Sequence, residues 1–156
     1  MKKALSQGFT LAELLIVLMI AGVLSIGALH GWQRWQQRQQ LRETALQMQS
    51  FLLRLRAHAN WHNRDYPIWH LPGERWCLGG GERPPQSCQP DKRLMLPAPH
   101  PDVKIYAING EPGFYGRRNV ARAGSIEFGN GAGRWRLIIS ARARIRLCQT
   151  SQEGCE

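Results

Sequence analysis

A long apolar run near the N-terminus constrains this chain more than any other feature. Residues 9–29 contain a single charged side chain, Glu13. At 1.5 Å of helix per residue, a run of this length reaches roughly 30 Å, which is the hydrocarbon thickness of a bilayer. We therefore expect a membrane-spanning helix over residues 9–29.

The residues in front of this run indicate its orientation. Lys2 and Lys3 are the only charged residues before Gly8, so the positive-inside rule places the N-terminus in the cytoplasm and the rest of the chain outside. A secretory signal peptide would have a small-residue cleavage site after its apolar core, and the bulky residues after Leu29 provide none. An uncleaved signal anchor is the alternative to a processed leader.

Glu13 is unusual within such a segment. A carboxylate at the centre of a span costs about 2.5–3.5 kcal/mol and normally has a partner. Cleavage after Gly8 would create a new α-amino group on Phe9, one helical turn from Glu13. That amine, in the same chain or in a neighbouring one, would supply the missing positive charge.

The segment GFTLAEL resembles the type IV prepilin leader. The resemblance implies that residues 1–8 are a leader removed by cleavage between Gly8 and Phe9, and that Phe9 is N-methylated. It also implies that prepilin peptidase is a partner, and that the helices assemble into a filament core in which Glu13 contributes to assembly.

The helix is expected to continue beyond the apolar run. Residues 30–59 contain no helix breaker, and their apolar side chains recur at alternating steps of four and three residues. These residues are Leu41, Ala45, Met48, Leu52, Leu55 and Ala59. Phe51 and Leu53 broaden this face, so burial against the protein's own sheet is favoured over a coiled coil with another protein. We predict one helix from about residue 9 to about residue 59.

From residue 60 onward the pattern changes to short extended segments separated by Pro and Gly. We predict strands at residues 66–71, 75–79, 92–97, 103–108, 125–129, 134–140 and 143–148. Residues 79–87 and 109–124 are predicted to be loops. The fold class is therefore α+β, a long helix packed on an antiparallel sheet, with residues 60–156 as one small domain. This arrangement is similar to the pilin fold and resembles the H-type minor pseudopilins and related minor pilins.

Four cysteines in an exported domain suggest two disulfides. Local pairing of Cys77 with Cys88 and of Cys148 with Cys155 is our expectation among three connectivities. C-x-x-C pairs, which a zinc site would need, are absent.

No cofactor, metal or catalytic group is predicted. His58 and His62 have the spacing of a shared metal site, but no third ligand is evident, and exposed histidines at a helix end are favoured; His70 and His100 are isolated. The glycine-rich residues 129–133 precede a strand, which indicates a hairpin turn. No nucleophile or carboxylate pair suggests an enzyme.

The formal net charge is +10, and arginines concentrate near the C-terminus. Arg142, Arg144 and Arg146 alternate with apolar residues, so one face of a strand would present three guanidinium groups. Arg134 and Arg136 repeat this pattern, and Arg117, Arg118 and Arg122 add charge. A nucleic-acid-binding surface is one interpretation. The alternatives are a solvated face, or one that meets acidic subunits or anionic lipid.

Together these features predict a minor type IV pilin-like subunit or pseudopilin of the bacterial inner membrane, with its C-terminal domain in the periplasm. The resemblance implies other pilin or pseudopilin subunits and an inner-membrane assembly platform as partners, and a position at the pilus tip after assembly. A DNA-binding tip module for uptake or adhesion is the second hypothesis.

Overall fold

The computed structural model describes residues 10–83, 88, 94–117 and 120–155; for residues 26–30 it describes the backbone but not the side chains. The chain divides into two compact units, Met1–Gln36 and Gln37–Glu156. One helix, α1, contributes to both units, and all the strands lie in the second.

Helix α1 runs without interruption from Leu11 to His62 over 52 residues. The prediction of a single long helix is confirmed, and the helix ends three residues later than expected. Asn63 has a φ of 50°, and the N–H of Arg64 donates to the carbonyl oxygen of Ala59 at 3.3 Å. This left-handed residue and the hydrogen bond that spans it form the Schellman motif that ends a helix.

The predicted apolar stripe of α1 is buried along its whole length. Its six residues are at most 3% exposed, and Phe51 is 2% exposed. Leu53 was expected on the same face, but it is 41% exposed. At 100° per residue, Leu53 lies about 200° around the helix from Leu55, so it cannot share that face.

In the described part of the chain, seven strands form one sheet in the order β3-β2-β1-β4-β5-β6-β7, with every pair antiparallel. The strands are β1 (Tyr66–Leu71), β2 (Cys77–Gly80), β3 (Met95–Pro97), β4 (Lys104–Phe114), β5 (Ala121–Asn130), β6 (Gly133–Ile139) and β7 (Ile145–Gln149). The α+β fold class expected from the sequence, a long helix packed on an antiparallel sheet, is confirmed.

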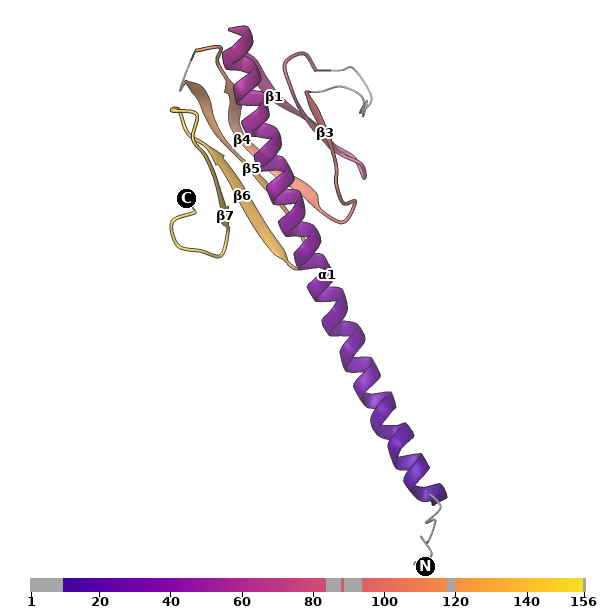
Figure 1. Cartoon of the computed structure of the whole chain (residues 1–156). Coiled ribbons are helices and arrows are strands. Elements are labelled where there is room, and N and C mark those ends of the chain that lie inside the picture. Colours follow the sequence, from indigo (N-terminus) through magenta and orange to yellow (C-terminus); the bar gives the residue numbers. More distant parts are fainter. Residues whose placement is uncertain (1–9, 84–87, 89–93, 118–119, 156) are drawn as a thin grey trace, which may run out of the picture. The chain divides into compact units, whose positions relative to one another are not determined.

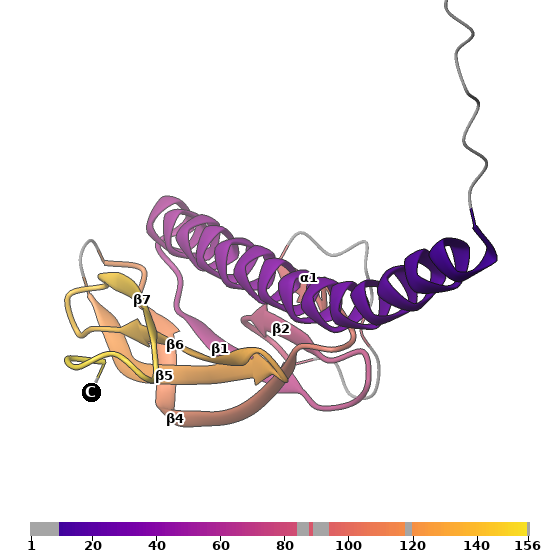
Figure 2. The same cartoon turned by 90° about the horizontal axis from the view of Figure 1, so that it is seen from below.

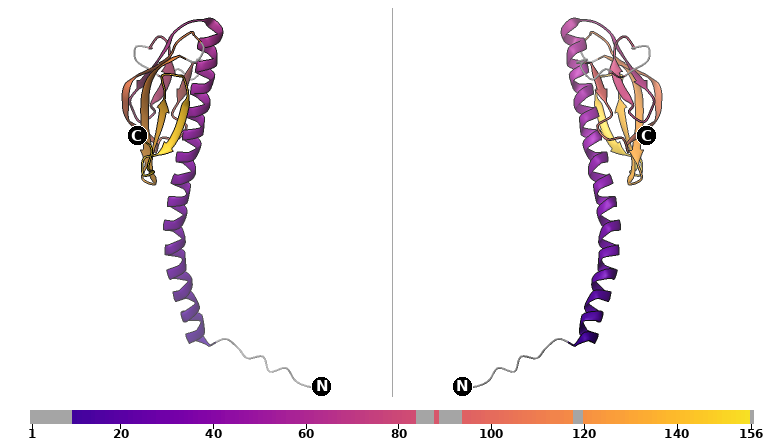
Figure 3. Two further views of the ribbon diagram at one scale, coloured as in Figure 1. Left: turned by 90° about the vertical axis from the view of Figure 1, so that its left-hand side faces the viewer. Right: turned by 90° about the vertical axis from the view of Figure 1, so that its right-hand side faces the viewer.

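Within the second unit, the C-terminal half of α1 covers one face of this sheet (Figures 1 and 2). The views in Figure 3 show these two layers edge-on. Between them lies a core that includes Phe51, Phe114 and Phe128. Trp76 is also buried, and its indole N–H donates to the carbonyl oxygen of Val103 at 2.6 Å.

The predicted loop over residues 109–124 is wrong, because most of it forms the hairpin of β4 and β5. The two strands pair from Lys104 with Gly129 to Phe114 with Ala121, with a register shift between Gly110 and Gly113. This irregularity accommodates Pro112, which has no N–H to donate to a ladder.

The predicted loop over residues 79–87 also begins too early. Gly79 and Gly80 belong to β2, where a Cβ on Gly80 would lie 2.4 Å from the Leu55 side chain and one on Gly79 would lie 2.1 Å from Trp69. These glycines are therefore required by close packing. Residues 84–87 of the predicted loop lie outside the described part of the chain. The strand predicted over residues 92–97 corresponds to β3, and its residues 92 and 93 also lie outside the described part.

Both disulfides join the pairs that were expected. Cys77 in β2 is bonded to Cys88, and Cys148 in β7 is bonded to Cys155. The first bond ties the segment after β2 to the sheet, and the second holds the C-terminal residues against the edge strand.

Candidate processing and assembly site

The beginning of α1 is stabilised by a threonine cap. The backbone N–H of Glu13 lies 3.4 Å from Oγ1 of Thr10 and 3.1 Å from its carbonyl oxygen. Thr10 therefore occupies the N-cap position and Glu13 the third helical position, where the helix dipole favours a negative charge. Gly8 and Phe9, the predicted cleavage and methylation positions, lie outside the described residues.

The first turns of the helix expose apolar side chains on every side. All residues from Leu11 to Ser25 are exposed, including Leu14, Ile16 and Val17 at 55–59%. Among the residues that the structure describes, no helix has a stretch both long enough and apolar enough to cross a membrane. The predicted span of 9–29 also includes Phe9 and the side chains of residues 26–29, which the structure does not describe.

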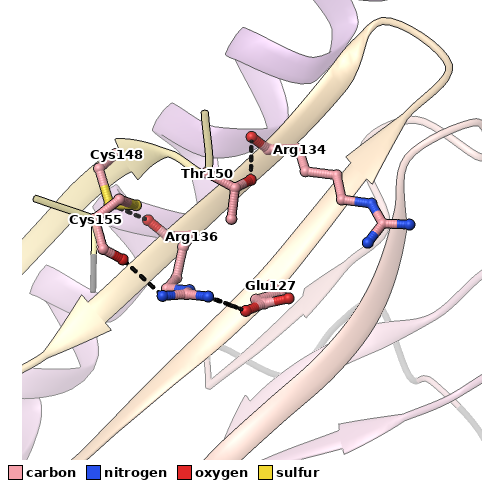
Figure 4. Close-up of a disulfide and its surroundings, with 6 residues drawn as sticks. All are labelled: Glu127, Arg134, Arg136, Cys148, Thr150 and Cys155. Carbon is pink, nitrogen blue, oxygen red and sulfur yellow. Dashed lines mark hydrogen bonds and ion pairs between the residues drawn. A yellow bond between two sulfur atoms is a disulfide. The ribbon is translucent and has the colours of Figure 1, made fainter. Parts of the chain in front are cut away.

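Among the arginines, Arg136 has a structural role (Figure 4). Its Nε and Nη2 donate to Oε1 of Glu127 at 2.9 and 2.5 Å, and its Nη1 donates to the carbonyl oxygen of Cys155 at 2.7 Å. Glu127 and Arg136 are directly paired in β5 and β6. The guanidinium thus connects two strands and the C-terminal disulfide loop, so the prediction that Arg136 belongs to a phosphate-binding surface is not supported.

Arg134 has a different environment on the same strand. Its guanidinium carbon lies 4.5 Å from the centroid of the Tyr106 ring, a cation–π contact across β5. Its carbonyl oxygen accepts a hydrogen bond from Oγ1 of Thr150 at 2.8 Å (Figure 4). Arg134 is exposed and keeps its charge at the surface beside an aromatic ring.

The predicted arginine ladder does not lie on one strand. Strand β7 begins at Ile145, and Ala143 is buried with a φ of 56°, so Arg142 and Arg144 precede the strand in a turn. The turn nevertheless gathers the three arginines, because Arg142, Arg144 and Arg146 line one open hollow of about 380 Å³. Its apolar lining includes Ile138 and Ala141. All three arginines are exposed.

Of the additional arginines, Arg117 and Arg122 are exposed. Arg122 donates to the hydroxyl of Tyr115 at 3.1 Å and to Oε2 of Glu111 at 3.3 Å. The hydrogen bond that Arg122 donates to Tyr115 is the main reason that the pKa of Arg122 is raised. Arg118 lies outside the described residues.

The histidines are packed against neighbouring side chains. The rings of His58 and His62 have centroids 3.9 Å apart. Burial, and then the charge of His62, lowers the pKa of His58. His100 was expected to be isolated, but its Nε2 lies 2.9 Å from Oε2 of Glu43. In the described part of the chain, no three His, Cys, Asp or Glu residues are placed to hold a metal ion.

Comparison with known proteins agrees with these features. Residues 3–29 match the family model of the prokaryotic N-terminal methylation motif. The fold is similar to the crystal structure of the type IV minor pilin FimU from Pseudomonas aeruginosa, with a TM-score of 0.53 and 17% identity over 78% of this chain and 99% of that one. The chain thus combines an N-terminal methylation motif with a fold similar to that of a minor pilin. No curated protein matches its sequence.

The methylation motif covers every residue to which the sequence analysis assigned processing or assembly. Gly8, Phe9 and Glu13 all fall within residues 3–29. The likeness to FimU concerns the fold alone. The cleavage, the methylation and the pairing of Glu13 therefore remain predictions for this chain.

Two features of this chain were not predicted from its sequence. The spacing of Thr10 and Glu13 is the T-x-x-E signature of a capping box, which could have been read directly. The ion pair between Glu127 and Arg136 could not be predicted from the sequence, because it depends on the register of β5 against β6.

Proposed function

We propose that this protein is a minor subunit of a type IV pilus or of a type II secretion pseudopilus, where it is incorporated into the filament or primes its assembly. It is made as a prepilin and cleaved between Gly8 and Phe9 by prepilin peptidase, which also methylates Phe9. The observation that carries this proposal is a methylation motif over residues 3–29 that leads directly into the long helix of a pilin-like fold.

In this proposal the work of the chain is physical, not catalytic. The exposed apolar side chains of residues 11–25 need a nonpolar environment, which lipid provides before assembly and the helices of other subunits provide afterwards. Membrane association through residues 9–29 places the N-terminus in the cytoplasm and the domain in the periplasm. The two disulfides are typical of a domain in that oxidising compartment.

Glu13 would direct the step from membrane to filament. Its carboxylate is exposed and forms no ion pair among the described residues. At 4 Å and an effective dielectric constant of 20, an amine would attract it by about 4 kcal/mol. The α-amino group of Phe9 on a neighbouring subunit is the proposed partner, and leader removal creates it. The partners are thus other pilin or pseudopilin subunits and the inner-membrane assembly platform.

The experiment compares wild type with Gly8→Val in cells that naturally make the protein. A branched side chain next to the scissile bond should block cleavage, so we expect the variant to retain its leader in the membrane fraction and to be absent from sheared filaments. Wild type should be found in both fractions. Equal recovery of both proteins in filaments would refute incorporation of the processed form, and absence of wild type from every filament fraction would refute the filament role.

A second candidate function is binding of DNA at the pilus tip. Two observations favour it. Arg142, Arg144 and Arg146 line one hollow beside β7. The guanidinium group of Arg134 lies over the ring of Tyr106. Guanidinium groups with an aromatic ring are the combination that nucleic-acid surfaces use. Arg136 is left out of this candidate because Glu127 and Cys155 engage it.

Salt dependence tests the second candidate. Residues 30–156 should bind duplex DNA with an affinity that falls steeply with salt, and changing Arg142, Arg144 and Arg146 together to Gln should reduce the slope of log affinity against log salt by about 2 to 3. Arg136→Gln is unsuitable as a control because it removes hydrogen bonds to Glu127 and Cys155 that we expect to stabilise the domain. Arg54→Gln on the helix serves instead. Identical slopes for wild type and the triple variant would eliminate this function.

A further inference from the structure

A hollow of about 460 Å³ is lined by α1, β6 and the end of β7. Arg38 and Arg42 line it from α1, and Trp135, Gln149 and Ser151 line it from the other two segments. We call it the helix-side hollow; all of these residues belong to the second unit. None of the described residues that line it is acidic. The helix-side hollow is therefore a concave site with a positive charge.

The charge of the helix-side hollow comes from two arginines that have no partner. Arg38 and Arg42 are four residues apart, so they occupy the same face on successive turns of α1, where like charges destabilise a helix. In the described part of the chain, neither side chain forms an ion pair or a hydrogen bond. The adjacent carboxylate, that of Glu43, is engaged by His100 at 2.9 Å. An anion bound in the hollow would relieve this repulsion.

The sheet side of the helix-side hollow supplies neutral hydrogen-bond donors. Gln149 is directly paired with Trp135 across β6 and β7, and Ser151 follows two residues later. Arg134 also lines the hollow, but its guanidinium carbon lies 4.5 Å from the ring centroid of Tyr106. Two unengaged guanidinium groups, a hydroxyl and an amide match a phosphate group, because its tetrahedral oxygens accept charge-assisted hydrogen bonds from several directions at once.

Hydrogen bonds hold the walls of the helix-side hollow in place. Nδ2 of Asn130 donates to the carbonyl oxygen of Gln37 at 2.8 Å, which ties the turn between β5 and β6 to the helix. Oδ1 of Asn130 accepts from the N–H of Ala132 at 2.9 Å. The hydroxyl and the N–H of Thr150 both donate to the carbonyl oxygen of Arg134, at 2.8 and 3.1 Å (Figure 4). The hollow is thus formed before any ligand binds, which lowers the cost of binding.

We propose that the helix-side hollow binds a phosphate group, with Arg38 and Arg42 as its principal ligands. Its volume of about 460 Å³ lies within the range of small-molecule sites, about 300–1,000 Å³, so the hollow has room for the group that the phosphate esterifies. Two sources would supply the phosphate: a soluble phosphate ester, or the headgroup of an anionic phospholipid. The second source is available because Arg38 follows the predicted span of 9–29 by nine residues. The inference does not depend on the filament role.

Titration of the full chain in phosphate-free maltoside micelles tests the proposal. Inorganic phosphate and a short-chain phosphatidylglycerol are the two probes, sodium chloride is the ionic-strength control, and NMR shifts of the backbone amides of Gly133 and Ser151 report binding. We expect at least one probe to give a saturable shift that chloride does not. Tighter binding of phosphatidylglycerol would identify a lipid headgroup as the ligand, and equal or tighter binding of inorganic phosphate a soluble ester. No saturable shift with either probe would overturn the proposal.

Substitutions assign the binding to the helix-side hollow. Arg38→Gln combined with Arg42→Gln should weaken it at least about tenfold, because two charge-assisted contacts are lost. Arg54→Gln combined with Arg75→Gln removes the same charge from exposed positions outside the hollow and should change the affinity less than about twofold. Equal affinities for these two double variants would overturn the proposal.

A variant on the sheet side covers the case in which the double variant of α1 does not fold, which its amide spectrum would reveal. Ser151→Ala removes only a hydroxyl from an exposed residue and should weaken binding about threefold or more. An unchanged affinity for Ser151→Ala would then overturn the proposal.

Discussion

The backbone N–H of Glu13 donates a hydrogen bond to the hydroxyl oxygen of Thr10, 3.4 Å away. This contact fixes the start of α1 immediately after Thr10. It also gives Glu13 a local role, because a carboxylate in the first turn stabilises the helix dipole. Local capping and pairing with a neighbour's amine are therefore two roles that the same side chain could have.

Substitutions at Glu13 separate these roles. Gln remains suitable at the third position of a capped helix but cannot pair as an anion. If pairing with the Phe9 amine drives assembly, Glu13→Gln and Glu13→Ala should both reduce the amount of subunit in sheared filaments while leaving cleavage intact. A reduction for Ala alone, with Gln at the wild-type level, would assign Glu13 to capping instead. Immunoblots of membrane and filament fractions provide the measurement.

The partly buried ion pair between Arg136 and Glu127 should stabilise the folded domain. Glu127→Ala leaves a guanidinium that is 24% exposed without its carboxylate, which we expect to lower the free energy of unfolding by about 2–3 kcal/mol. Glu111→Ala, in the exposed pair with Arg122, is the control and should cost less than about 1 kcal/mol. Urea unfolding of residues 30–156 provides both values. Equal losses for the two variants would show that Glu127 makes no special contribution.

The C-terminal disulfide is expected to stabilise the same region. Replacing Cys148 and Cys155 with Ser should cost about 2–3 kcal/mol, because the bond closes a short loop in the unfolded chain. The variant should also loosen the hydrogen bond from Arg136 to Cys155, so amide exchange should accelerate at the end of the chain more than in β1. Unchanged stability under oxidising conditions would contradict this assignment.

Stability should depend on pH through His70. Burial of the ring, and then the charge of Arg83, lowers the pKa of His70, whereas the unfolded chain retains a value of about 6.5. The unfolded state therefore binds more protons between these two values. The contribution of neutral His70 is fully present above about pH 6.5 and is lost as the pH falls through the lower folded pKa.

Urea midpoints measured from about pH 7.5 down to about pH 5 test this expectation. Wild type should lose stability on acidification, and His70→Gln should lose less, although His58 contributes in the same direction. Parallel pH profiles for the two proteins would show that His70 is not responsible.

The helix was the most predictable part of the fold, because six apolar residues at regular spacing define its buried face without reference to the sheet. Leu53 shows the limit of that reasoning: it is apolar like its neighbours, but its angular position places it on the opposite side. Gly79 and Gly80 were read as loop residues by type, whereas the side chains of Trp69 and Leu55 require glycine inside a strand. Residues 109–114 were also predicted to be a loop because they contain glycine and proline, but they belong to β4.

The candidate site was predictable only where its signal is local. The motif at Gly8, Phe9 and Glu13 is contiguous and matches a family model. The arginines at 142, 144 and 146 suggested a strand by alternation, but the left-handed backbone at Ala143 replaces its first part with a turn. The partners of Arg134 and Arg136 come from other strands, so sheet register decides that one stacks on Tyr106 and the other binds Glu127.

The central claim is that a processed N-terminus converts this chain into a filament subunit, and intact mass measurement of the protein from its native membrane tests it most directly. The proposal predicts a chain that begins at Phe9 and carries one added methyl group, and an unprocessed chain that begins at Met1 when prepilin peptidase is deleted. A chain that retains Lys2 and Lys3 in cells with active peptidase would contradict it.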